Sequence, residues 1–288
     1  MRTGISPKDF AEAIGVSESS VKRWVDQGAL TALRTTGGHR RISRHEALRF
    51  IREQHGQLVR PEKLGLEPSV LGIPRNAPLQ QAAEQLHGYL LHGREPETRG
   101  VLTGVYLAGN TIAAIGDDVI RPAMERLGVL WHDSEHGILV EHRATTLCLR
   151  VLEELRGMIH DTAAHLDGAK VAVVAGPERD PYLLAPTLTS LTLFECGLEV
   201  VSLGPDTPLS VVELAAREAG ASLIALSCTS EPDDRLRREV ARLVDNAVAA
   251  KCHVALGGKT VASLGVAVRP YVLIGRSLRE LVEFASHL

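Results

Sequence analysis

The sequence predicts a multidomain chain with an α-helical winged helix-turn-helix, a four-helix bundle and an α/β doubly wound domain of Rossmann-like type. Three observations support this fold class. A helical apolar pattern with a tight turn and a basic hairpin fills the start of the chain, and apolar residues then recur at helical spacing from Leu79. From Gly168 onward, apolar strands alternate with amphipathic helices. We therefore expect a head at 1–58, a linker at 59–78, a helical bundle at 79–166 and a doubly wound domain at 167–288.

The head begins with two short helices that share an apolar face. Gly15 lies where the chain must turn sharply between them. The expected core of this helix-turn-helix consists of Phe10, Ala11, Ile14, Val16, Val21 and Trp24. The second helix leaves a polar face free, which suits a helix lying in the major groove of DNA.

A basic hairpin follows the second helix. Thr35-Thr36-Gly37-Gly38 forms a turn between two short extended runs, and three basic residues come directly after it. This arrangement predicts a wing that carries positive charge. The residues expected to contact DNA are Ser19, Ser20, Lys22, Arg23, Arg34, Thr36, His39, Arg40 and Arg41.

The charge distribution favours a nucleic-acid partner although the formal net charge is −3. Between residues 20 and 60 there are nine lysines and arginines against Asp26, Glu46 and Glu53, so a basic head precedes an acidic body. Such a local surplus attracts phosphates. We expect double-stranded operator DNA as a partner. Since one small head offers limited contact area, we also expect a homo-oligomer, either a dimer or a tetramer.

Composition indicates a soluble cytoplasmic protein with no membrane partner. No apolar run is long enough to span a bilayer, and no signal peptide is evident at the N-terminus. The four cysteines, at 148, 196, 228 and 252, have neither metal-ligand spacing nor a compact disulfide pattern.

The bundle contains a candidate ligand site at a helix junction. Trp131-His132 is followed ten residues later by Glu141-His142. The Trp could stack on a flat ligand while the His and Glu side chains bind its polar edge. The alternative is a core Trp with solvent-facing histidines.

The doubly wound domain offers a second set of candidates where its strands end. Ligands of such folds lie at the carboxyl ends of the strands, where small residues allow close approach to the backbone. Glycines there also serve ordinary turns, so both interpretations remain open. The candidate ligand-binding residues of this domain are Glu178, Asp180, Gly204, Asp206, Thr207, Ser227, Cys228, Ser230, Gly257 and Gly258.

The head resembles the winged helix-turn-helix domain of the MerR family, because Gly37, Gly38, His39-Arg40 and Ile42 match its wing. Over nearly its whole length the chain is similar to light-responsive repressors of the CarH and LitR type. Trp131 and Glu141-His142 match their bundle motif, and further matching segments are Leu203–Pro208, Leu226-Ser227, Ser230-Glu231-Pro232 and Leu256-Gly257-Gly258.

The resemblance implies a fold, a cofactor and a mechanism. In these repressors a MerR-like head is followed by a four-helix bundle and a cobalamin-binding domain, which hold adenosylcobalamin between them. It further implies a repressor that assembles in the dark and dissociates when light breaks the cobalt–carbon bond.

The chain departs from this pattern at two positions. Asp180 stands where the family has the His that ligates cobalt, and Leu183 stands where a Gly makes room for the nucleotide tail. Three possibilities follow: cobalamin without a protein ligand to cobalt, a tail-less tetrapyrrole such as biliverdin (a bilin) or haem, or a ligand-independent regulator. With the second, His132 or His142 could ligate a metal, and Cys228 could approach a vinyl group.

An enzyme is the competing class, since corrinoid domains with helical bundles also occur in methyltransferases and mutases. The sequence shows no second catalytic domain, Walker-type loop or nucleophile with a nearby base. Glu178 and Asp180 resemble an acid–base pair, but carboxylates at this place more often cap the next helix. We therefore expect no enzymatic activity.

Overall fold

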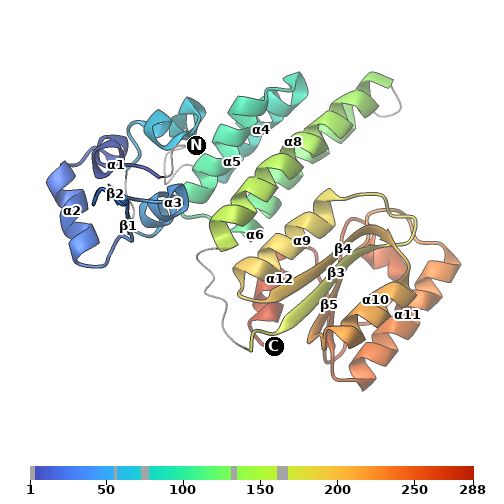
Figure 1. Cartoon of the computed structure of the whole chain (residues 1–288). Coiled ribbons are helices and arrows are strands. Elements are labelled where there is room, and N and C mark those ends of the chain that lie inside the picture. Colours follow the sequence, from blue (N-terminus) through green and yellow to red (C-terminus); the bar gives the residue numbers. More distant parts are fainter. Residues whose placement is uncertain (1–3, 55–56, 73–77, 131–134, 161–167) are drawn as a thin grey trace. The chain divides into compact units, whose positions relative to one another are not determined.

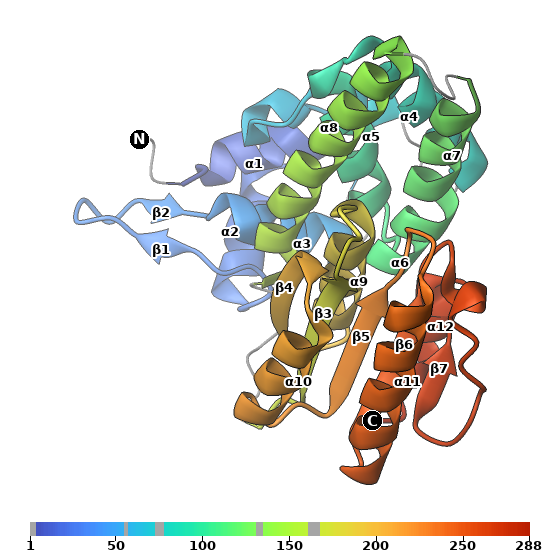
Figure 2. The ribbon, with the colours of Figure 1, turned by 90° about the vertical axis from the view of Figure 1, so that its right-hand side faces the viewer.

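The computed structural model describes residues 4–54, 57–72, 78–130, 135–160 and 168–288. The chain divides into two units, one formed by Met1–Thr111 and Asp118–Thr162, the other by Ile112–Asp117 and Ala163–Leu288. Figures 1 and 2 show their helices and strands. The head and the helical bundle belong to the first unit, and the sheet belongs to the second.

The head consists of three helices and a hairpin, and serine side chains start the helices. Ser6, Ser17 and Ser43 accept hydrogen bonds from backbone N–H groups in the first turns of the helices that follow them, as N-cap residues do. Gly15 ends the first helix with a φ of 70°, which glycine adopts without strain. Figure 2 shows the hairpin extending away from the helices. The elements are α1 (Pro7–Ile14), α2 (Glu18–Asp26), β1 (Leu33–Arg34), β2 (Arg40–Arg41) and α3 (Arg44–Glu53).

Aromatic rings fill the centre of the head. Phe10 meets Phe50 edge to face with ring centroids 5.9 Å apart, and the half-buried Trp24 lies tilted against Phe50 at 4.9 Å. Val16 was expected in this core, but it is 37% exposed. It lies in the turn between Gly15 and the N-cap Ser17, so it does not share the buried helical face.

Part of the expected linker is folded. Two short 3-10 helices, η1 (Pro61–Leu64) and η2 (Pro68–Gly72), lie within it. Leu64, Leu66 and Val70 are buried in the same core as the residues of the three head helices. The prolines interrupt an α-helix, but the apolar side chains between them still pack on the head.

Four helices form the bundle, as expected. These are α4 (Leu79–His92), α5 (Glu95–Leu107), α7 (Arg121–Leu130) and α8 (Glu135–His160). Helix α4 contacts the other three, and α8 contacts α5 and α7 as well. Leucines at helical spacing, such as Leu86, Leu90 and Leu152, are fully buried between them. No described helix is long and apolar enough to cross a membrane.

The second unit is built on a parallel five-stranded sheet with the order β4-β3-β5-β6-β7. The strands are β3 (Val171–Pro177), β4 (Glu199–Thr207), β5 (Leu223–Ser227), β6 (His253–Gly257) and β7 (Val272–Ile274). Helices α10 (Leu209–Glu218) and α11 (Asp234–Ala249) cover one face, and α9 (Leu184–Glu195) and α12 (Leu278–Ala285) cover the other. This is the expected doubly wound architecture.

Residues 112–117 were expected in the bundle but belong to the second unit. The N–H of Ile112, at the start of α6 (Ile112–Ile115), donates to Glu195 Oε2 at 2.7 Å. The carboxylate of Asp117 accepts hydrogen bonds from the N–H groups of Leu278 and Arg279 at 3.0 and 3.1 Å. The first amides of a helix have no acceptor within the helix, and the Asp117 carboxylate supplies one at the start of α12, which joins the segment to this unit.

Candidate functional site

The head contains a basic hollow of about 550 Å³. Lys8 from α1, Lys22 from α2 and the wing residues His39, Arg40 and Arg41 line it. The structure therefore brings the second helix and the wing together, and their basic side chains line one concave surface together with the Glu18 carboxylate. Such a concentration of positive charge suits contact with DNA phosphates.

Polar residues on α2 also hold the start of that helix. The Ser17 hydroxyl lies 2.8 Å from the Ser19 hydroxyl and 2.9 Å from that of Ser20, and it accepts the Ser20 N–H at 3.1 Å. Lys22 forms an ion pair with Glu18 at 2.8 Å. Arg23 is exposed on the same helix.

The wing is fixed to α2 by Arg40. Its guanidinium donates to Asp26 Oδ1 at 2.5 Å and to the Lys22 carbonyl at 3.4 Å. Arg34, Thr36 and His39 are exposed, and Arg41 is half-buried. Arg40 therefore sets the position of the wing in addition to contributing charge.

Much of the basic surplus counted in the sequence is used inside the protein. Arg49 pairs with Glu46 and Glu53, and Arg60 pairs with Glu12 at 3.5 Å. Arg44 donates to the Gly65 carbonyl, and Arg52 donates to the carbonyls of two bundle residues. The surface available to DNA is therefore smaller than the charge count suggested.

Lys8 was missed by the sequence analysis. The signal was present, because Ser6-Pro7 is a typical helix start and places Lys8 in the first exposed turn.

The bundle candidates are only partly visible. Trp131 and His132 lie outside the described residues. Glu141 and His142 lie on α8, with His142 Nε2 3.6 Å from Glu141 Oε2 and the His142 side chain 75% exposed.

Helices α7 and α8 of the bundle also carry three large apolar side chains that are exposed. Val129 on α7 is 81% exposed, and Ile138 and Leu139 on α8 are 55% and 56% exposed. Ile138 and His142 are one helical turn apart. Exposed apolar side chains beside a carboxylate and an imidazole are compatible with a flat ligand that has a polar edge.

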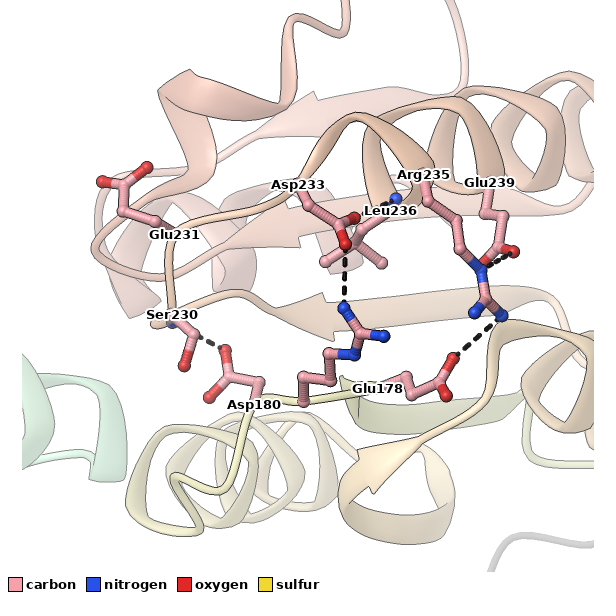
Figure 3. A pocket seen from close by; sticks show the side chains of 9 residues that line it. Glu178, Asp180, Ser230, Glu231, Asp233, Arg235, Leu236 and Glu239 are labelled. Atoms are coloured by element: carbon pink, nitrogen blue, oxygen red, sulfur yellow. Dashed lines mark hydrogen bonds and ion pairs between the residues drawn. The ribbon is translucent and has the colours of Figure 1, made fainter.

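Asp180 is the most constrained of the sheet candidates. Its side chain is 1% exposed, and its carboxylate accepts hydrogen bonds from the N–H groups of Thr229 at 2.5 Å, Ser230 at 3.0 Å and Tyr182 at 3.3 Å. Figure 3 shows it directed at Ser230. The expectation that it caps the following helix was wrong, because α9 has no side-chain N-cap and Asp180 instead binds the loop after β5.

Glu178 does not pair with Asp180 as an acid–base couple. Glu178 Oε2 accepts a hydrogen bond from Arg235 at 3.3 Å, whereas Asp180 is held by backbone amides. Figure 3 shows the two carboxylates pointing to different partners.

Asp206 joins the loop after β3 to the end of β4. Its carboxylate accepts the Arg179 N–H at 2.7 Å, and its own N–H donates to the Asp180 carbonyl at 2.9 Å. Gly204, with a φ of 79°, allows the bend at this end of β4, and the Thr207 hydroxyl lies near three carbonyl oxygens of the same bend. The Ser227 hydroxyl is buried and lies 3.1 Å from that of Thr189.

Cys228 is buried in the core on the α10 and α11 face of the sheet. Burial, followed by the nearby Asp180 charge, raises the pKa of the thiol to about 12. A buried thiol that stays protonated is a poor nucleophile, which argues against attachment to a vinyl group.

The two glycines after β6 differ in role. A Cβ on Gly258 would lie 2.2 Å from the Cys228 carbonyl oxygen, so only glycine allows this contact. A Cβ on Gly257 would meet nothing nearer than 3.8 Å.

A small polar cavity of about 100 Å³ lies beside Asp180. Ion pairs line it: Arg179 with Asp233 at 3.0 Å, and Arg235 with Glu178 at 3.3 Å and Glu239 at 2.9 Å. Figure 3 shows Arg235 between its two carboxylates. The cavity is smaller than the roughly 300–1,000 Å³ of typical ligand pockets. Among the described residues, no group of three or more His, Cys, Asp or Glu could hold a metal ion.

Comparisons with known proteins identify two segments. Residues 5–55 match the helix-turn-helix domain family, and residues 82–156 match the B12 binding domain family. No curated protein matches the chain.

Three solved structures are similar. The monomethylamine corrinoid protein of Methanosarcina barkeri is 18% identical, with a TM-score of 0.53 over 73% of this chain and 99% of that one. The methanol:cobalamin methyltransferase complex MtaBC of the same organism is 16% identical, with a TM-score of 0.35 over 77% and 84%. A cobalamin-binding protein of Desulfitobacterium hafniense DCB-2 is also 16% identical, with a TM-score of 0.37 over 73% and 98%.

The first of these structures shows a shared fold. A corrinoid protein is thus among the structural neighbours, but the helix-turn-helix match suggests a regulator rather than an enzyme. The matches support DNA binding by the head and cobalamin binding by the B12-binding region. The chain combines a helix-turn-helix DNA-binding domain with a B12-binding domain, a composition that fits a MerR-like regulator with a cobalamin-binding domain.

Proposed function

We propose that this chain is a light-responsive transcriptional repressor that binds operator DNA and is controlled by adenosylcobalamin. The observation that carries the proposal is the presence of both family matches, at 5–55 and 82–156, in one chain. Since one head binds DNA over a small area, a change in the number of joined subunits changes affinity through avidity. The ligand would therefore act on DNA binding through assembly, with the dimer or tetramer as the high-affinity form.

The residues fit the corrinoid unequally. On α8 of the bundle, Ile138 and Leu139 beside Glu141 and His142 suit the apolar face and amide edge of a corrin ring. In the sheet domain the residues do not fit a cobalamin held through a protein ligand, because the buried Asp180 carboxylate already accepts three backbone hydrogen bonds. The proposal therefore includes no bond between cobalt and this domain.

This misfit favours a second candidate, a repressor of the same architecture with a tetrapyrrole that has no nucleotide tail. Biliverdin and haem are the two tetrapyrroles without a tail that the sequence leaves open. The cavity of about 100 Å³ beside Asp180 leaves little room for a tail, and neither ligand needs one.

The test uses the full-length chain with adenosylcobalamin, haem and biliverdin supplied separately in the dark. After desalting, absorption spectra show which ligand is retained. Fluorescence anisotropy with DNA from upstream of its own gene, and light scattering after size exclusion, are then measured before and after illumination. We expect adenosylcobalamin to be retained, and light to lower both the mass and the DNA affinity. DNA binding and mass that do not respond to light with any bound ligand would contradict the proposal.

Trp131 supplies a mutational test. The substitution Trp131→Ala is expected to leave DNA binding by a single head intact and to abolish the ligand response, because stacking on the ring is lost. Anisotropy with ligand-free protein is the internal control. Full switching by the variant would show that the bundle site is wrongly assigned.

A further inference from the structure

The strand order of the sheet determines where a ligand would bind in this domain. In open α/β sheets, ligands bind at the carboxyl ends of the strands, where the strand order reverses. In this chain β3 lies between β4 and β5, so the reversal falls at the ends of β3 and β5. The loops that follow these strands contain Asp180 and Thr229-Ser230, respectively.

Asp180 joins the loops after β3 and β5 through hydrogen bonds at these strand ends. One carboxylate oxygen accepts the N–H groups of Thr229 and Ser230, and the other accepts the N–H of Tyr182 in its own loop. The side chain is 1% exposed. If the carboxylate turned toward a metal ion, three backbone donors would lose their acceptor, which is unfavourable for buried amides.

The end of β4 and the loop after β6 add further hydrogen bonds to the β3 and β5 loops. The Asp206 N–H donates to the Asp180 carbonyl at 2.9 Å. The Thr260 hydroxyl donates to the Ser230 carbonyl at 2.8 Å, and the Thr260 N–H donates to the Cys228 carbonyl at 3.1 Å. Three loops and the end of β4 are thereby joined around the place where a nucleotide tail would pass.

The space that remains is too small for such a tail. The adjoining cavity measures about 100 Å³ and is bordered by the ion pairs of Arg179 and Arg235. A group built from a benzimidazole, a ribose and a phosphate is of the size that needs about 300 Å³ or more.

We infer that the sheet domain is closed to the nucleotide tail of cobalamin, with Asp180 as the positioning residue that holds the β3 and β5 loops together. This inference rests on the proposed function in taking a corrinoid as the ligand. It follows that a cobalamin bound to this chain keeps its own benzimidazole on cobalt.

The first experiment identifies the axial ligand. Full-length protein, uniformly labelled with ¹⁵N, is loaded with unlabelled cobalamin, reduced to the cobalt(II) state and examined by electron paramagnetic resonance. We expect the three-line nitrogen splitting of the cofactor's own ¹⁴N base. A two-line splitting from protein ¹⁵N, or no axial nitrogen splitting, would overturn the inference because the tail would have left cobalt.

Cobinamide, a corrinoid without the nucleotide tail, distinguishes binding of a corrin ring from exclusion of the tail. Binding of cobinamide without binding of cobalamin supports closure of the sheet domain. If neither binds, the corrinoid part of the proposed function fails, and the closure is decided by the second experiment, which needs no ligand.

The second experiment tests Asp180 directly in the full-length, ligand-free chain. The variants Asp180→Asn and Asp180→Ala are compared with Glu178→Gln, which changes a more exposed carboxylate two residues away. We expect the Asp180 variants to lower the apparent Tm by roughly 5 °C or more and the control to leave it nearly unchanged. Hydrogen exchange should also speed up selectively at the amides of Thr229 and Ser230. Unchanged protection of these two amides in Asp180→Ala would overturn the inference.

Discussion

At the scale of single residues, backbone amides decide the role of several carboxylates. Asp180 accepts N–H groups from Thr229 and Ser230, and Asp117 accepts them from Leu278 and Arg279. Glu46 accepts the Thr31 N–H at 2.6 Å. In each case the carboxylate holds a loop or a helix start rather than facing solvent. From its position in the sequence, Asp180 was expected to cap the following helix, whereas it binds the loop after β5.

Glu46 should make the head sensitive to acid. Burial raises its pKa, but hydrogen bonds from Arg49 and from the Thr31 N–H outweigh burial, so the pKa lies below its ordinary value of 4.5. The resulting stability is present above the ordinary value and is lost as the pH falls through the lowered one. We expect urea denaturation of the head to show a larger loss between about pH 5 and pH 3 in the native sequence than in Glu46→Gln. Equal losses in the two proteins would contradict this role, and Glu62→Gln, at an exposed position, serves as control.

Gly258 and Gly265 form a matched pair that separates backbone strain from contact. Both have positive φ, 100° and 68°, but a Cβ would collide with the Cys228 backbone only at Gly258. Gly265→Ala should cost about 1 kcal/mol of unfolding free energy from strain alone. Gly258→Ala should cost about 3 kcal/mol or more, since the loop after β5 must also move. Chemical denaturation of the two variants measures the difference, and equal costs would mean that the close approach is not essential.

At the scale of elements, the hairpin and α2 together form one basic surface. The ion pair between Arg40 and Asp26 fixes the wing, and Lys22 and the wing cations line one hollow. The wing could be predicted because its turn residues and charges are local in sequence. The pairing of Arg40 with Asp26 could not, since it joins residues 14 positions apart on different elements.

Arg41 should contribute to DNA binding through phosphate contact. Arg41→Ala is expected to weaken binding to all DNA sequences and to reduce the slope of log affinity against log salt by about 0.9. Arg217→Ala, an exposed arginine on α10, is the control. Anisotropy titrations at several salt concentrations measure both effects. A loss confined to one DNA sequence would indicate base contact instead.

At the scale of the whole molecule, the chain is joined by contacts that its linear order does not reveal. Within the first unit, Arg52 on α3 donates to the carbonyls of Tyr106 and Asn110 and lies 3.9 Å from the centre of the Tyr106 ring. Helix α3 also contacts α5 and α8. The head is therefore attached to the bundle by a side chain that contributes to the basic surplus of residues 20–60.

Loss of Arg52 should loosen this attachment. Arg52→Ala is expected to destabilise the docking of α3 on α5 by about 2 kcal/mol, since hydrogen bonds and a cation–π contact are lost. Arg52→Lys should recover only part of this, because an ammonium lacks the planar fork of the guanidinium. Hydrogen exchange of the α3 amides measures the effect, with Arg156→Ala as the control at an exposed position on α8. Unchanged exchange in Arg52→Ala would refute the attachment.

The fold could be predicted further than the site. The apolar runs of β3, β5 and β6 and the period of α4 are local patterns, and they predicted the sheet and the bundle. The helix-turn-helix was predicted from Gly15 and the aromatic residues around it. The candidate ligand residues were predicted as a set near the strand ends. The roles of Asp180 and Cys228 within that set could not be, because burial and backbone partners depend on neighbouring strands.

The sequence by itself determined the order of domains, the class of each fold and the basic character of the head, because periodicity, turn residues and charge are properties of short segments. Only the tertiary structure decided that residues 61–72 are folded, that residues 112–117 belong to the sheet unit, and that Asp180 joins the ends of β3 and β5. Asp180 binds amides 49 and 50 positions away, and Asp117 binds amides 161 and 162 positions away. Such partners are chosen by the packing of the sheet and its helices, which no local pattern encodes.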